Sequence, residues 1–284
     1  MRADIMHSRA VQWTVIIVSL VYALLAQRYS WAGPGAYVLA ALPPLLATMV
    51  ARTWLAGAFM ILLPMYFVIG HATADRVHYQ PFTGIDRMML LSPRWMLVYG
   101  SLYMAGFLLP LVVVRGRLRF EQAMKAYLFV MVLSYAGFIA YPTIAPRLEP
   151  VDITGFATWS LQLFYDLDQP YGCFPSLHVA FSVIGAMACF GMHRGVGVTA
   201  AAWAALIGVS TIYTKQHFAV DAIAGAVVGC AGWAIFLRRA PSEHVHERDR
   251  RLAPARAAAV AGAYAAAVAG FWLAYSLGFG PASR

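Results

Sequence analysis

Long apolar segments recur along this chain of 284 residues, and they constrain its fold more than any other feature. A helix needs about 20 mostly apolar residues to cross a bilayer. Candidate segments lie at roughly 10–27, 35–52, 54–70, 95–114, 124–141, 175–192, 197–213, 217–237 and 256–277. The sequence therefore predicts an all-α fold, a polytopic transmembrane helical bundle with about eight or nine spans.

The composition excludes two other classes of protein. Apolar residues make up 61% of the chain and charged residues 12%, with a mean hydropathy of +0.66. Soluble domains carry about 25% charged residues, and disordered chains combine low hydrophobicity with high net charge. The chain is therefore expected to be an integral membrane protein.

Three regions follow from the order of the segments. We expect N-terminal transmembrane helices and an interfacial linker over 1–94, a catalytic transmembrane core over 95–237, and a basic loop with a C-terminal transmembrane helix over 238–284. Within the first region, the apolar residues of 82–93 have helical spacing. This spacing suits a short helix that lies on the membrane surface.

Basic residues are distributed unequally between the two sides of the predicted bundle. Alternating the segments places 14 of the 21 Lys and Arg residues on the side of the N-terminus. Cytoplasmic loops carry an excess of Lys and Arg, so the N-terminus is predicted to be cytoplasmic. The linkers 71–94 and 142–174 then lie outside. The net charge of +9 reports this orientation, and no nucleic-acid partner is implied.

Two segments carry ionisable residues next to predicted spans, where such residues mark functional sites by default. They are 172–182, which contains Pro-Ser-Leu-His, and 210–225, which contains Lys-Gln-His and an Asp. The predicted topology places both at the outer interface, although they are far apart in sequence. They can therefore meet there.

His217 and Asp221 are spaced i, i+4 and are predicted to share one helix face. A carboxylate that accepts a hydrogen bond from one imidazole nitrogen makes the other a better nucleophile or base. Lys215 adds a positive charge two residues earlier, and the start of a helix favours a bound anion. A polar cluster that serves only helix packing is an equally open interpretation.

Ser176 and His178 begin the sixth predicted span. Pro and Ser suit the start of a helix, where backbone N–H groups and the Ser hydroxyl could hold phosphate oxygens. His178 could donate a proton to a leaving oxygen. Arg147, near the outer end of the fifth span, is a residue type suited to multidentate phosphate binding. Ordinary helix capping and an interfacial Arg are the alternatives.

Nearby acidic and sulfur-containing residues are less specific. Asp166 and Asp168 could recognise a substrate hydroxyl or only solvate their loop. Cys173, Cys189 and Cys230 contain no CxxC pair and are odd in number, so we expect them to serve packing, without a metal or redox framework.

The two segments together resemble a known family. Phe-Pro-Ser-Leu-His, followed by Lys-Gln-His, three residues, Asp, three residues and Gly, is similar to the second and third motifs of the type 2 phosphatidic acid phosphatase superfamily. The resemblance implies a six-helix core. It also implies that His217 attacks phosphorus and forms a phosphohistidine, that Asp221 orients it, that His178 protonates the leaving group and that Ser176 binds phosphate.

Two departures from the superfamily pattern modify this prediction. The usual first motif, Lys, six residues, Arg-Pro, is absent, and Ser210-Thr211 stands where Ser-Arg is usual. Arg147 and Lys215 are the residues that could supply the missing charge. The pattern Tyr-Pro, three residues, Pro-Arg, combined with Phe-Pro-Ser-Leu-His, resembles the branch that contains inositolphosphorylceramide synthase. That branch transfers a phosphorylated head group from one lipid to another.

The sequence therefore predicts a membrane-embedded lipid phosphatase or phosphotransferase, placed in a bacterial inner membrane with its site at the periplasmic interface. We expect no metal and no cofactor. The expected partners are a lipid phosphate, the membrane and, for transfer, a lipid acceptor. A polyprenyl diphosphate or phosphatidylglycerophosphate phosphatase that uses water is the alternative enzyme. A membrane transporter is the alternative from another class, although no internal repeat supports it.

Overall fold

A computed structural model describes residues 53–63, 65–148, 151–240 and 245–281, and the regular elements within these ranges are all helical. They are α4 (Trp54–Leu62), α5 (Met65–Thr73), α6 (Gly84–Met88), η1 (Pro93–Trp95), α7 (Met96–Tyr99), η2 (Met104–Leu108), α8 (Leu109–Val113), α9 (Arg117–Ala140), α10 (Phe156–Leu167), α11 (Leu177–Phe190), α12 (Arg194–Tyr213), α13 (Ala219–Gly232), η3 (Trp233–Leu237) and α14 (Glu247–Ser276).

Five helical stretches of the described chain are long and apolar enough to cross a membrane. They are Pro93–Val113, Arg117–Ala140, Arg194–Tyr213, Ala219–Leu237 and Glu247–Ser276, and α11 is a shorter apolar helix. The prediction of an all-α bundle of membrane-spanning helices is confirmed.

Two predicted spans, 10–27 and 35–52, lie outside the described residues. The predicted span 54–70 is instead two helices, α4 and α5, with Pro64 between them in the sequence. Proline has no backbone N–H to donate, so it favours a break in a helix. The short helix predicted within 82–93 is present as α6.

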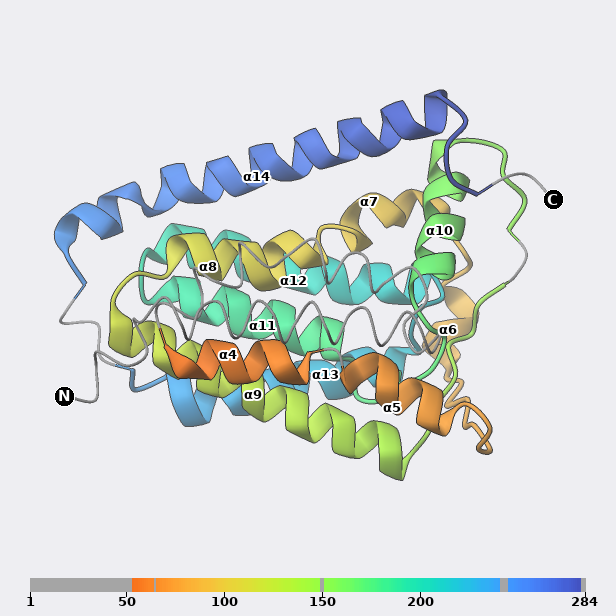
Figure 1. Cartoon of the computed structure of the whole chain (residues 1–284), viewed down its shortest axis with the longest axis horizontal. Coiled ribbons are helices and arrows are strands. Elements are labelled where there is room, and N and C mark those ends of the chain that lie inside the picture. The colour runs from red at the N-terminus through yellow and green to blue at the C-terminus, as the bar shows by residue number, and fades with distance from the viewer. Residues whose placement is uncertain (1–52, 64, 149–150, 241–244, 282–284) are drawn as a thin grey trace.

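The bundle is built around α11. Figure 1 shows α9, α11, α12 and α13 running along the long axis, and α11 packs against α9, α12, α13 and η2. Helix α10 lies across one end, where α5 and α6 also lie. Helix α14 runs along the outside, over α8 and α12. The end that carries α5, α6 and α10 is where the loops before α11 and α13 meet.

Glycines let α11 approach its neighbours closely, as small residues do in membrane bundles. A Cβ on Gly225 of α13 would lie closer than 3.0 Å to the carbonyl oxygen of Ser176. A Cβ on Gly229, one turn later, would lie 2.8 Å from Cβ of Val183 and 3.0 Å from the carbonyl oxygen of Ala180. Helix α13 is therefore held directly against the first turns of α11.

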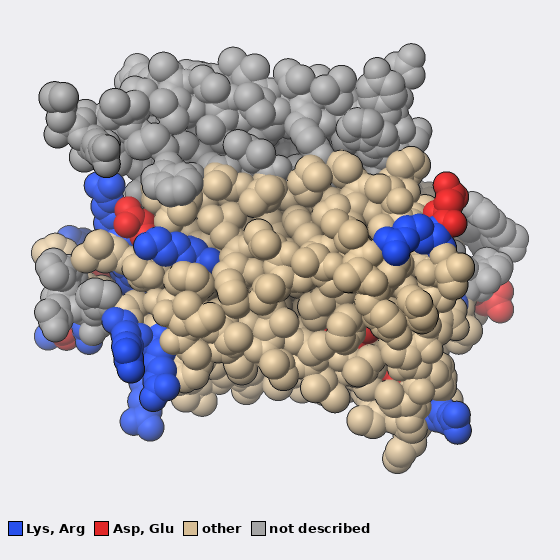
Figure 2. Space-filling model, turned by 90° about the horizontal axis from the view of Figure 1, so that it is seen from below, with Lys and Arg blue, Asp and Glu red and all other residues tan. Residues whose placement is uncertain are grey.

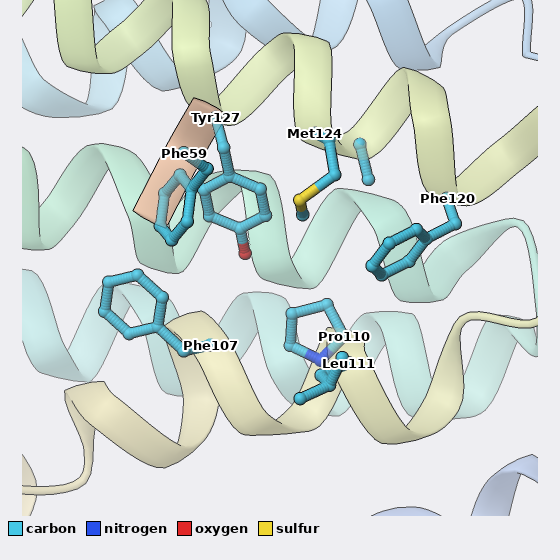
Figure 3. Close-up of a pocket in the computed structure, with 8 residues that line it drawn as sticks. Phe59, Phe107, Pro110, Leu111, Phe120, Met124 and Tyr127 are labelled. Carbon is cyan, nitrogen blue, oxygen red and sulfur yellow. The ribbon is translucent and has the colours of Figure 1, made fainter. Parts of the chain in front are cut away.

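Aromatic rings fill the core on the other side of α11. The rings of Phe59, Phe107, Tyr127 and Phe181 lie within 6.2 Å of one another, centroid to centroid. Some of them line an apolar cavity of about 10 Å³ between α4, α8 and α9 (Figure 3). That volume corresponds to roughly one water molecule, so this cavity does not accommodate a lipid head group.

Charged side chains gather at the two ends of the molecule. On the face drawn in Figure 2, a broad band with few charges separates a cluster of Lys and Arg at one end from a smaller group at the other. Helix α14 contributes little to the interior, because Ala253 and Val260 are its only buried residues within the described part of the chain. Such a distribution is typical of a helical bundle that spans a bilayer.

Candidate active site

The loop before α11 ends in a side-chain cap. Ser176 is the N-cap residue, and its Oγ accepts the N–H of Val179 at 3.4 Å. The helix begins at Leu177, so His178 lies in its first turn. Helix capping, the alternative interpretation of Ser176, is observed, because the hydroxyl satisfies a backbone donor that a helix start leaves free.

The turn between α12 and α13 presents the second histidine. Helix α13 begins at Ala219 with Phe218 as its N-cap, so His217 precedes the helix. The prediction that His217 and Asp221 share one helix face is therefore wrong. Asp221 instead folds back to accept the N–H of Phe218 at 2.9 Å with Oδ2. The pair still meets, because the carboxylate that caps the helix start also faces the residue just before it.

Four predicted side chains converge at this end of the bundle. Nε2 of His217 lies 3.2 Å from Oγ of Ser176 and 3.1 Å from Nδ1 of His178. Nδ1 of His217 lies 3.6 Å from Oδ2 of Asp221. A hydrogen bond of 3.0 Å from the backbone N–H of Ser176 to the carbonyl oxygen of Asp221 ties the two loops together.

The converging groups are shielded from solvent. Ser176 and Asp221 have no exposed surface, and His217 is 4% exposed. Within the described residues, Nδ1 of His217 and Oδ1 of Asp221 have no hydrogen-bond partner. An imidazole backed by a buried carboxylate, with a second imidazole on its other nitrogen, can act as a nucleophile beside a proton donor.

Arg147 lies beside this cluster with its donors directed at oxygen atoms of the protein. Its Nη1 donates to the carbonyls of Tyr165 and Asp168 at 3.0 and 2.9 Å. Its Nη2 donates to the carbonyl of Gln169 at 3.1 Å and to Oε1 of Gln216 at 2.7 Å. The guanidinium therefore joins the loop after α10 to the residue that precedes His217.

Lys215 also binds backbone oxygens. Its Nζ donates to the carbonyl of Met89 at 2.6 Å and to that of Asp86 at 3.4 Å. Burial lowers the pKa of Lys215, and the charge of Asp86 opposes that change. The side chain points toward the linker that carries α6, so it does not contact the paired histidines.

Asp86 is a residue of this site that the sequence did not single out. Its Oδ1 accepts the N–H of Ala219 at 2.8 Å, and its Oδ2 accepts the N–H and hydroxyl of Thr83 at 2.8 and 2.5 Å. The spacing Thr83-x-x-Asp86 is a recognisable capping pattern, but it predicts only the start of α6. The contact with α13 joins residues 133 positions apart and has no local signal.

Cys173 lies close enough to complete a group of potential metal ligands. Its Sγ, a ring nitrogen of His217 and a carboxylate oxygen of Asp221 lie within 4.8 Å of one another. Burial raises the pKa of the Cys173 thiol, and metals bind the thiolate. The same carboxylate oxygen that faces His217 accepts a backbone N–H, so pairing within the protein accounts for the closeness of the His and the Asp.

These features define a membrane-embedded helical protein with a buried site of two histidines and an aspartate. Residues 90–235, just over half of the chain, match the PAP2 superfamily. The chain belongs to this superfamily, as its motifs predicted. No curated protein and no solved structure matches the chain. Membership supports an enzyme with phosphatase-type activity on a lipid phosphate.

Proposed function

We propose that the protein cleaves a lipid phosphate ester in two steps through a phosphohistidine on His217. The observation that carries this proposal is the convergence on Nε2 of His217. That nitrogen faces Ser176 and His178 within 3.2 Å, while the opposite nitrogen faces the buried Asp221. Phosphorus would sit where the two imidazole nitrogens and the Ser hydroxyl point.

In the first step, Nε2 of His217 attacks phosphorus, so a P–N bond forms as the P–O bond to the alcohol breaks. Asp221, whose Oδ2 lies 3.6 Å from Nδ1, would move into hydrogen-bond distance of the Nδ1 proton and stabilise the imidazolium. His178 gives its proton to the departing alcohol oxygen. In the second step, water or a lipid hydroxyl attacks phosphorus, His178 takes its proton, and the P–N bond breaks.

Negative charge on the phosphoryl group is stabilised by two kinds of group. Ser176 and the backbone N–H groups at the start of α11 supply direct hydrogen bonds at the positive end of the helix dipole. Arg147 and Lys215 already donate to protein oxygens. They therefore contribute a positive potential across the site and fix the loops that carry His217.

The same arrangement is compatible with a site at a membrane interface. The two histidines lie at the ends of apolar helices, and charges gather at both ends of the molecule (Figure 2). If the N-terminus is cytoplasmic, as the distribution of basic residues predicts, the site would face the periplasmic interface of a bacterial inner membrane. A lipid could then present its head group to the site while its acyl chains stay in the bilayer.

The acceptor distinguishes hydrolysis from transfer. The motif around Arg147 favours a branch similar to inositolphosphorylceramide synthase, in which a lipid hydroxyl replaces water. We would assay purified protein against labelled phosphatidic acid, phosphatidylglycerophosphate, phosphatidylinositol and polyprenyl diphosphate, with and without ceramide or diacylglycerol. A transferase forms a phosphodiester only when the acceptor is present, whereas a phosphatase releases inorganic phosphate without it.

A His217→Ala variant is the control for this mechanism. It should lose all phosphate transfer, and acid-labile label from the substrate should no longer attach to the protein. Normal turnover by this variant would refute the mechanism. A transporter would show no turnover in wild type or variant.

The proposed chemistry runs without a metal. Chelation should therefore leave turnover unchanged, and Cys173→Ser should keep most of it. Loss of activity on chelation, restored by a divalent metal and abolished by Cys173→Ser, would instead assign the group Cys173, His217 and Asp221 to a metal.

A further inference from the structure

One carboxylate at the site takes no part in the proposed chemistry. Asp168 is the C-cap residue of α10 and is partly buried. Its Oδ1 accepts the hydroxyl of Tyr66 at 3.0 Å. The next residue, Gln169, donates from Nε2 to the carbonyl of Tyr66 at 2.8 Å. The end of α10 is thereby fixed to α5 by two hydrogen bonds.

Asp168 is linked to the paired histidines through Tyr66. The ring of Tyr66, which holds the carboxylate, lies 6.5 Å from the ring of His178. The ring of Tyr99 lies 5.8 Å from that of His178, and the charge of Asp168 acts on Tyr99 as well. The charge of Arg147 acts on Asp168 in turn. Tyr66 and Tyr99 thus lie next to His178, and Asp168 lies behind the hydroxyl of Tyr66.

A carboxylate at this position is unfavourable for phosphate binding, because it repels the phosphate that the site is proposed to hold. A compensating role in substrate binding is therefore expected. An ionised carboxylate only accepts hydrogen bonds, so its partner in a substrate must be a donor. Burial raises the pKa of Asp168 above its usual 3.8, although Arg147 and the Tyr66 hydroxyl oppose the rise. Burial of Asp168 at this position therefore destabilises the ionised form of its carboxyl group.

The neighbours of Asp168 favour a neutral donor over a cationic one. Arg147 binds the backbone carbonyl of Asp168 at 2.9 Å, and its guanidinium supplies the balancing positive charge. A second cation, such as the ammonium of an ethanolamine or choline head group, would be repelled by that guanidinium. A hydroxyl group donates one hydrogen bond to the carboxylate without adding charge, and a charged acceptor makes this bond strong.

We propose that Asp168, oriented by Tyr66, binds a hydroxyl group on the alcohol portion of the substrate, next to the oxygen that His178 protonates. This inference rests on the proposed function and favours its hydrolytic form, because the diacylglycerol that departs in head-group transfer has no free hydroxyl beside the ester carbon. The alcohol would carry its hydroxyl on the carbon adjacent to the ester carbon, as glycerol and other polyols do. A site built to bind a hydroxyl discriminates against an analogue without one, because its own polar group is then left unpaired.

The test compares two substrates that differ by one hydroxyl: 1-alkylglycerol 3-phosphate and its 2-deoxy analogue. The readout is the ratio of kcat/KM for the pair, measured on the same enzyme preparation, so partial unfolding of a variant cancels. Wild type should prefer the hydroxylated ester by about tenfold or more. Asp168→Ala should reduce the preference to within about twofold, and Asp168→Asn, which keeps an acceptor for Tyr66, should also reduce it.

Asp166 supplies a matched control two residues earlier. It is exposed, and its Oδ1 accepts a hydrogen bond from the side chain of Gln162 in the same helix, at 2.8 Å. Asp166→Ala should keep the wild-type ratio. An Asp168→Ala ratio equal to that of wild type would overturn the inference, as would a wild type without any preference. An equal loss on both esters would show a structural role instead. Absence of turnover by wild type on every lipid phosphate would refute the proposed function itself.

Discussion

Replacing Gly225 with Ala tests whether the close approach of α13 to α11 sets the geometry of the site. An added Cβ would lie 3.1 Å from both the carbonyl carbon and the Cβ of Ser176, and closer still to the carbonyl oxygen. Carbon atoms need about 3.5 Å. The obstacle is backbone, which a rotamer change cannot move. The two helices must therefore separate by on the order of 1 Å to restore ordinary contact.

That displacement acts directly on the proposed reaction. Ser176 and His178 belong to the displaced turn, and both lie within 3.2 Å of Nε2 of His217. A misplacement of about 1 Å costs roughly 100-fold in rate, and overpacking costs about 1–3 kcal/mol in unfolding free energy. Gly225→Ala should therefore fold with a lower melting temperature and show a kcat about two orders of magnitude below wild type.

Two glycine variants separate the causes. Gly229→Ala meets Val183 and the carbonyl of Ala180, one turn farther from Ser176, so it should lower stability similarly and activity less. Gly262 of α14 has nothing within 4 Å of an added Cβ, so Gly262→Ala should change neither. Phosphate release and thermal unfolding in detergent measure both quantities. Gly225→Ala turnover within threefold of wild type would refute this account of the site.

Three further variants test the groups that hold the loops in place. Asp86→Ala removes the acceptor for the N–H of Ala219, so it should lower the free energy of unfolding by about 1 kcal/mol and also lower turnover. Asp75→Ala, at an exposed position, should change neither quantity. Thermal unfolding and phosphate release measure the two effects. Arg147→Lys loses the planar guanidinium that binds several oxygens, so it should lower the free energy of unfolding by about 2 kcal/mol. A melting temperature of this variant equal to that of wild type would contradict this expectation. Burial raises the pKa of Asp168, so its ionisation destabilises the fold once the pH exceeds its usual 3.8. Asp168→Asn should therefore have a higher melting temperature than wild type at pH 8, and the difference should vanish below pH 3.8. A melting-temperature difference that does not depend on pH would contradict this reasoning.

Much of the fold could be predicted from apolar segment length alone. The predicted span 95–114 corresponds to Pro93–Val113, and 197–213 corresponds to Arg194–Tyr213. The membrane-spanning class follows because every backbone polar group must be satisfied within a helix in a bilayer. The break within 54–70 was not predicted, although the sequence has Pro64 there, because a single proline barely lowers the average hydropathy of an apolar segment.

The site was predictable where the motif is local. Ser176, His178, His217 and Asp221 meet, although the helical pairing of the last two was wrong, because helix α13 starts two residues later than assumed. The contacts of Arg147 and Lys215 could not be predicted, since their acceptors are backbone carbonyls of distant loops. A basic residue type predicts affinity for negative oxygen atoms, and it does not say whether protein or substrate supplies them.

The hydrogen bond from Ala219 to Asp86 limits where this enzyme could be joined to another family member in a chimeric protein. Asp86 and Tyr66 both precede the segment that matches the superfamily. Asp86 nevertheless caps the helix after His217, and Tyr66 orients Asp168. A transplant of residues 90–235 onto the N-terminal helices of another family member would carry the motifs without these two supports. Exchange of N-terminal helices between relatives should therefore change selectivity and rate together, and active chimeras need their crossover before α5.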